Sequence, residues 1–155
     1  MVDVSEKPVT VREAVARARV TMKPETLALI EAGQGPKGEV LGVARVAAIM
    51  AVKRTGDLVP MCHPVSIRGI DVEFRTGGPA VPGESASIEL EVTVKAEDKT
   101  GVEMEALTGA AVGALAIYDM CKSVDRGMVI QDIRLIHKSG GRSGEYRREG
   151  EAQWD

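Results

Sequence analysis

A thiol, an imidazole and two cations lie close together in the first half of the chain. Lys53 and Arg54 shortly precede residues 60–64, which contain Cys62 and His63 between two prolines. The prolines exclude a regular helix, and loops on a rigid scaffold commonly carry functional side chains. Because histidine titrates near neutral pH, His63 is a candidate acid or base. The structural alternative makes Cys62 a small core residue and His63 a histidine with satisfied hydrogen bonds.

A carboxylate and an amine share one predicted helix face in the second half of the chain. Asp119 and Lys122 are three residues apart, and such residues are neighbours on a helix surface. They follow the apolar residues 110–118, so the sequence predicts a partly buried cleft in which the pair has perturbed pKa values and transfers protons. The alternative is an ordinary solvated ion pair.

Two further segments have the composition of anion-binding sites. Residues 138–144, KSGGRSG, combine Lys138 and Arg142 with hydroxyls and glycine-exposed backbone amides. They do not match the P-loop pattern, and flexible tails have a similar composition. Residues 101–107 open a long predicted helix, with Thr100 as the expected N-cap, and their backbone amides either bind a polar or anionic group or only begin the helix.

The predicted strands and helices around these residues follow a recognisable order. Strands show alternating apolar positions, and helices show broad apolar faces. The predicted strands are residues 11–22, 69–75, 87–95 and 129–137, and the predicted helices are residues 24–31, 40–53 (as a buried helix) and 101–124. Gly109 and Gly113 are expected to allow close packing of the last helix. This order is the split βαβ arrangement of a ferredoxin-like α+β fold, with an antiparallel sheet and helices packed on one face.

Composition limits the remaining classes of function. The 155 residues are 44% hydrophobic with a formal net charge of -3, which fits one globular domain over residues 1–155 and argues against nucleic-acid binding. We expect no membrane span, a cytoplasmic location and reduced thiols. The charged residues 145–155 are expected to form a partly disordered, flexible tail.

Six short sequence blocks are distributed over nearly the whole chain. They are MVDVS (1–5), KRT (53–55), CHP (62–64), TGVEMEALT (100–108), YDMCK (118–122) and KSGGRSG (138–144). Together they closely resemble the cyclic pyranopterin monophosphate synthase family, the molybdenum cofactor biosynthesis protein C. The pair TGVEMEALT and YDMCK is the most specific part of this resemblance.

The resemblance implies a lyase that converts 3′,8-cyclo-7,8-dihydro-GTP into cyclic pyranopterin monophosphate and releases pyrophosphate. It also implies a homo-oligomer, a hexamer built as a trimer of dimers, with the site at a subunit interface. Neither a cofactor nor a protein-bound metal is expected, although whether a divalent cation such as Mg²⁺ accompanies the triphosphate is left open.

The resemblance also implies roles for individual residues. Asp119 would be the central acid-base residue and Lys122 its partner, and negative charge that develops during the reaction would be stabilised by nearby cations. The implied catalytic residues are Asp119, Lys122, Lys53, His63 and Lys138, and the implied substrate-binding residues are Met61, Cys62, His63, Met104, Glu105 and Arg142. Arg142 replaces the family's usual lysine, which keeps the charge but changes the hydrogen-bond geometry near the triphosphate.

Two other classes of function are compatible with some of these residues. One is a non-catalytic nucleotide-binding module that uses the same basic loops. The other is a metal or thiol enzyme that uses Cys62, His63 and Cys121, although these are not at metal-ligand spacing.

Overall fold

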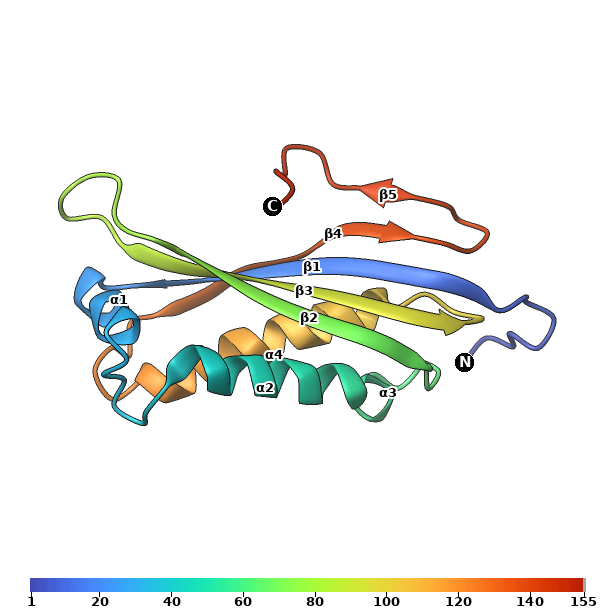
Figure 1. Ribbon diagram of the computed structural model, residues 1–155, viewed down its shortest axis with the longest axis horizontal. Helices are drawn as coiled ribbons and strands as arrows, with labels where there is room; N and C mark the ends of the chain where they lie inside the picture. The colour runs from blue at the N-terminus through green and yellow to red at the C-terminus, as the bar shows by residue number, and fades with distance from the viewer. Residues whose placement is uncertain (155) are drawn as a thin grey trace.

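The computed structural model describes residues 1–154 and contains one antiparallel sheet (Figure 1). Its strands are β1 (Thr10–Met22), β2 (Ile67–Gly77), β3 (Ala86–Asp98), β4 (Val129–Ser139) and β5 (Tyr146–Arg147). The strand order is β2-β3-β1-β4-β5. Because β3 pairs antiparallel with both β1 and β2, these two strands run parallel on either side of it. The predicted α+β fold with a split βαβ order is confirmed.

Two long helices cover one face of the sheet, and the C-terminal segment lies over the other (Figure 1). The helices are α1 (Pro24–Glu31), α2 (Val40–Lys53), α3 (Thr55–Leu58) and α4 (Glu103–Cys121). Three of them match the predicted helices, with α4 shorter than predicted at both ends. The single turn α3 was not predicted.

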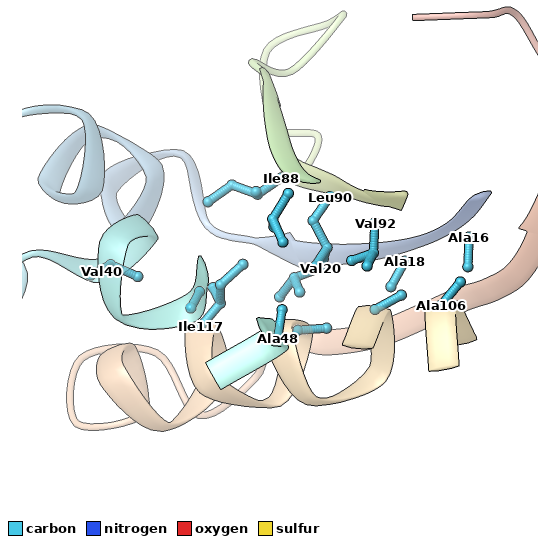
Figure 2. Close-up of a cluster of buried hydrophobic side chains, with 14 of the residues drawn as sticks. Ala16, Ala18, Val20, Val40, Ala48, Ile88, Leu90, Val92, Ala106 and Ile117 are labelled. Atoms are coloured by element: carbon cyan, nitrogen blue, oxygen red, sulfur yellow. The ribbon is translucent and has the colours of Figure 1, made fainter. Parts of the chain in front are cut away.

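The core lies between the sheet and the two long helices (Figure 2). Along β1, Ala14, Ala16, Ala18 and Val20 are fully buried, as their alternation predicted. Since three of these four side chains are methyl groups, the helix layer can lie close to the sheet. Larger buried side chains come from α2, β3 and α4: Val40, Ile88, Leu90, Val92 and Ile117.

Two glycines allow α4 to approach its neighbours closely, as expected. A Cβ atom added at Gly109 would lie 2.7 Å from Cγ2 of Val52 on α2. One added at Gly113 would lie 2.6 Å from Cδ1 of Leu90 on β3. Both distances are shorter than a van der Waals contact, so a side chain at either position would push α4 away from α2 or from the sheet.

The prediction that α2 is a buried helix is only half right. Its inward face is buried, but Val43, Val46 and Met50 are 46%, 57% and 53% exposed on its outer face. Leu115 of α4 is 56% exposed as well. The apolar residues of α2 therefore lie on two faces of the helix, and only the inward face is covered within this chain.

The predicted cap of α4 is wrong. The N-cap position is Val102, without a side-chain cap hydrogen bond, and not Thr100. Among the described residues, α4 is the one helix long and apolar enough to cross a membrane. It is a core helix of this fold, because its residues pack on β1, β3 and α2.

The C-terminal segment has a defined course. Residues Tyr146 and Arg147 pair with β4, and Glu151 forms ion pairs with Arg17 and Arg134 on the open face of the sheet. The sequence predicts a flexible tail here, and these contacts show how part of it is held. Its mobility in solution stays a prediction.

Candidate functional site

Helix α4 separates the candidate residues into two groups. Met104 and Glu105 lie in its first turn, whereas Asp119 lies in its last turn. At a rise of 1.5 Å per residue, Glu105 and Asp119 are about 21 Å apart along the helix axis. One chain therefore does not bring all the predicted site residues together.

The first group surrounds the start of α4. A cavity of about 170 Å³ is lined by Met61, Cys62, His63, Met104 and Glu105, among others. The predicted substrate-binding residues of this loop and of α4 therefore meet in one place. An adjoining cavity, also about 170 Å³, is lined by Lys53 at the end of α2 and shares Glu105 with the first.

Glu105 is the buried acid of this group. Glu105 is only 4% exposed, and desolvation raises the pKa of its carboxyl group above the ordinary value. Burial also raises the pKa of the Cys62 thiol, and the nearby Glu105 carboxylate adds to this rise. The thiol therefore favours its protonated form, which is the less nucleophilic one.

A larger cationic cavity adjoins the first group. It has a volume of about 700 Å³, and its lining includes Lys7, Arg12, Lys99 and Arg142. Arg12 is 9% exposed, and its Nε atom has no hydrogen-bond partner. Its Nη2 donates to the carbonyl oxygen of Lys99 at 3.1 Å. A buried donor without a partner is costly, so this cavity is suited to an anionic group.

Lys138 approaches the cationic cavity from β4. It pairs with Ala14 of β1, whose side chain faces the helix layer, and its Nζ donates to Oγ of Ser143. Ser143 and Arg142 both line the cavity. Gly140 and Gly141 have positive φ values of 94° and 73°, and an added Cβ at Gly141 would lie 1.8 Å from Nη1 of Arg12. The glycines thus let the loop close over Arg12.

The second group lies at the other end of α4. Asp119 accepts hydrogen bonds at 2.8 Å from Nζ of Lys122 and at 2.8 Å from Nζ of Lys37. The bond from Lys122, followed by the bond from Lys37, lowers the pKa of Asp119 to about 2. The carboxylate is therefore ionised and bridges two amines.

The predicted cleft around Asp119 and Lys122 is not formed within one chain. Their side chains are 51% and 50% exposed. Among the apolar residues before Asp119, Ala114 and Ile117 are buried, but Leu115, one helical turn before Asp119, is exposed. The apolar run therefore did not indicate burial of Asp119 and Lys122. The predicted ion pair is present.

The structure argues against a joint site of the two thiols. Cys121 is buried at the end of α4, whereas Cys62 lies beside its start. Burial raises the pKa of Cys121 as well. Within residues 1–154, no three His, Cys, Asp or Glu side chains are grouped as metal ligands would be.

The sequence patterns did not identify Lys37, Arg12 or Lys99 as site residues. Lys37 lies in a glycine-rich loop, and a lysine between Pro36 and Gly38 gave no sign of a contact with Asp119. For Arg12 a signal was available, because the alternation that turns Ala14 and Ala16 inward also turns Arg12 toward the helix layer.

The comparisons with known proteins assign a family. The model of the MoaC family matches residues 1–141. The chain belongs to the MoaC family. It is 58% identical over 154 residues to cyclic pyranopterin monophosphate synthase of Pelotomaculum thermopropionicum, covering 99% of this chain and 88% of the relative.

Two further relatives have the same name. The synthase of Desulforamulus reducens is 54% identical over 155 residues, with 100% of this chain and 91% of the relative covered. That of Chloroflexus aurantiacus is 58% identical over 148 residues, with 96% and 88% covered. The resemblance inferred from the six sequence blocks is confirmed, as is the prediction that this MoaC chain is an enzyme of the kind its relatives' name describes.

Proposed function

We propose that the chain is a lyase of molybdenum cofactor biosynthesis that converts 3′,8-cyclo-7,8-dihydro-GTP into cyclic pyranopterin monophosphate and pyrophosphate. The name shared by the relatives supports the product. The observation in the structure that carries the proposal is the carboxylate of Asp119 held between Lys37 and Lys122. Such a cluster can exchange protons with a substrate that replaces one of the amines.

The cationic cavity supports a polyphosphate substrate. We assign the triphosphate to Arg12, Lys99 and Arg142, with Lys138 beside them. Closing the cyclic phosphate breaks the bond between the α-phosphorus and the bridging oxygen, so negative charge develops on the leaving pyrophosphate. Fixed cations stabilise this charge. A divalent cation such as Mg²⁺ would travel with the triphosphate rather than occupy a site of the protein.

The first group of residues suits the pterin-forming end of the substrate. Met61, Cys62 and Met104 would contact the rings, while Glu105 and His63 would hydrogen-bond their polar edges. Lys53 would balance charge from the adjoining cavity. The overall reaction is a rearrangement without net oxidation, and Asp119 and Lys122 would carry out its proton transfers.

A complete site requires a second copy of the chain, because Asp119 lies about 21 Å from Glu105 along α4. The exposed apolar residues of α2 and α4 give a surface on which a second helix layer could pack. In a two-fold dimer each chain presents the same surface to the other, so antiparallel helix layers bring the end of one α4 near the start of its partner. We propose this dimer as the unit of a hexamer, located in the cytoplasm.

A coupled assay tests the proposed activity. The purified chain and its Asp119→Asn variant are supplied with 3′,8-cyclo-7,8-dihydro-GTP, and pyrophosphate and the pterin product are followed. Asp71→Asn, which changes an exposed carboxylate of β2, is the matched control. We expect equal amounts of both products from the unchanged chain and the control. Asp119→Asn should bind substrate but lose about 10²- to 10⁴-fold in rate.

The same assay separates the competing functions. Binding without release of pyrophosphate by the unchanged chain would favour a non-catalytic nucleotide-binding module. Full activity of Asp119→Asn would remove Asp119 from the reaction. Added EDTA should leave the rate unchanged if the triphosphate needs no divalent cation.

A further inference from the structure

The C-terminal residues 142–154 extend beyond the family match, which ends at residue 141. Residues 146 and 147 pair with β4 at the edge of the sheet, and the chain that follows them lies over the face opposite the helices (Figure 1). We propose that this segment is a strap that fixes the position of Lys138 and Arg142, with Glu151 and Trp154 as its positioning residues. The proposal rests on the proposed function insofar as it concerns the role of those two cations.

The far end of the strap, residues 151–154, is held by the buried Arg17 and the partly buried Arg134. Glu151 forms an ion pair at 2.9 Å with Nη1 of Arg17, which is 2% exposed, and it also pairs with Arg134. Nη2 of Arg17 donates to the carbonyl oxygen of Ala152 at 2.7 Å. Arg17 is itself fixed on the sheet by an ion pair with Glu91 at 2.6 Å, so its two remaining guanidinium nitrogens form a fixed anchor for Glu151 and Ala152 of the strap.

An aromatic ring completes the far anchor. The Trp154 ring centroid lies 4.8 Å from Cζ of Arg17 and 4.7 Å from Cζ of Arg75. Both distances allow a cation–π interaction. Since Arg17 belongs to β1 and Arg75 to β2, the strap crosses the sheet from β4 to the opposite edge strand.

The near end of the strap, residues 146–148, is hydrogen-bonded to β4 and directly follows the loop that carries Arg142. The backbone N–H of Arg148 donates to the carbonyl oxygen of Ile136 at 2.8 Å, and Tyr146 pairs with Lys138. Nε of Arg148 donates to the carbonyl oxygen of Leu135 at 2.7 Å. Residues 140–144 close this hairpin, so both ends of the loop that carries Arg142 are tied to β4.

β4 itself is less regularly held than the other strands. β1 pairs with β3 without interruption from Thr10 to Met22. The pairing of β1 with β4, in contrast, shifts register twice, between Val15 and Ala16 and between Arg17 and Arg19 of β1. A strand with such interruptions is held by fewer regular ladder bonds, and a strap across the sheet compensates for them.

Four variants test the strap. Glu151→Gln and Trp154→Ala weaken its far anchor, Trp154→Phe keeps an aromatic ring, and Glu149→Gln makes the same charge change at an exposed position of the same segment. The measurements are amide hydrogen exchange of residues 138–147, the affinity for inorganic tripolyphosphate, and the KM and kcat of the proposed reaction.

We expect Glu151→Gln and Trp154→Ala to speed exchange in residues 138–147 and to weaken tripolyphosphate binding. KM should rise by about 3- to 30-fold, while kcat changes less, because the two residues act through the position of the loop. Trp154→Phe should restore most of the affinity, and Glu149→Gln should resemble the unchanged chain.

If Glu151→Gln and Trp154→Ala both leave the hydrogen exchange of residues 138–147 and the tripolyphosphate affinity unchanged, the proposed role of the strap is wrong. If Glu151→Gln does not fold, the comparison of Trp154→Ala with Trp154→Phe decides the question. Failure of the proposed function is recognised separately, since the unchanged chain would then show no turnover while exchange and tripolyphosphate affinity still report on the strap.

Discussion

The carboxylate of Asp119 lies 2.8 Å from Nζ of Lys37, although 82 residues separate the two in sequence. Together with Lys122, Lys37 lowers the pKa of Asp119 to about 2. A carboxylate with so low a pKa is a poor proton acceptor while both amines remain in place. Under the proposed function, Asp119 would therefore accept a proton only after the substrate displaces or rearranges one of these lysines.

The first prediction concerns Lys37. Lys37→Gln removes one of the two cations, so the pKa of Asp119 should rise toward 3.8, its ordinary value. Carboxyl carbon NMR during a pH titration measures this shift. Turnover should fall by about 10²-fold or more, because Lys37 and Asp119 would act together. Lys23→Gln, at an exposed lysine, is the control. An unchanged Asp119 titration would show that the contact is not kept in solution.

The second prediction concerns the shared site. Asp119→Asn and His63→Gln chains should each be inactive alone but recover activity when unfolded together and refolded. Random pairing makes half of the dimers mixed, and each mixed dimer has one intact site of two, so about a quarter of the full activity is expected. Enzyme assays across mixing ratios measure this recovery. No recovery, with mixed dimers demonstrated by mass spectrometry, would place both residues in the same chain's site.

The third prediction concerns the pH dependence of stability. Burial raises the pKa of Glu105 above 4.5, so the folded chain binds this proton more tightly than the unfolded chain does. The Glu105 contribution therefore becomes less favourable to folding as pH rises from 4.5 through the raised pKa. Glu105→Gln cannot ionise, and its Tm at pH 7 should exceed that of the unchanged chain by about 2–4 °C, the shift that ~1 kcal/mol produces at this size.

Thermal unfolding at several pH values checks this difference. The Tm gain should disappear below pH 4.5, where Glu105 is protonated in both states. Glu84→Gln, at an exposed turn residue, should show no gain at any pH. The activity of Glu105→Gln should fall, because in the proposed function this carboxylate binds the substrate, although its burial lowers the stability of the fold. A lower Tm at pH 7 would contradict the unfavourable burial.

The fourth prediction concerns the packing of α4. Gly113→Ala inserts a methyl group where only 2.6 Å is available to Leu90, and overpacking of this kind costs about 1–3 kcal/mol. Gly127→Ala adds the same group where the nearest atom is 3.5 Å away, so its stability should hardly change. Denaturant unfolding of the two variants gives the difference. Equal stabilities would mean that α4 shifts without cost.

Much of the fold could be predicted because its signals are local. The inward face of β1 followed from the alternation of Ala14, Ala16 and Ala18, and a strand pattern of period two needs no knowledge of distant residues. The grouping of His63 with Glu105 could be anticipated only through the family resemblance. Their residue types gave no reason to place the loop after α3 beside the start of α4.

The strands, the long helices, the split βαβ order and the family could be inferred from the residues alone, because local periodicity and short motifs carry that information. The three-dimensional packing was needed to show that α4 holds the candidate residues about 21 Å apart, that Asp119 is exposed, and that Lys37 reaches it. It also decided that Glu151 meets Arg17 across the open face of the sheet. The physical reason is that such contacts depend on which faces of distant elements pack together, and no local pattern records this.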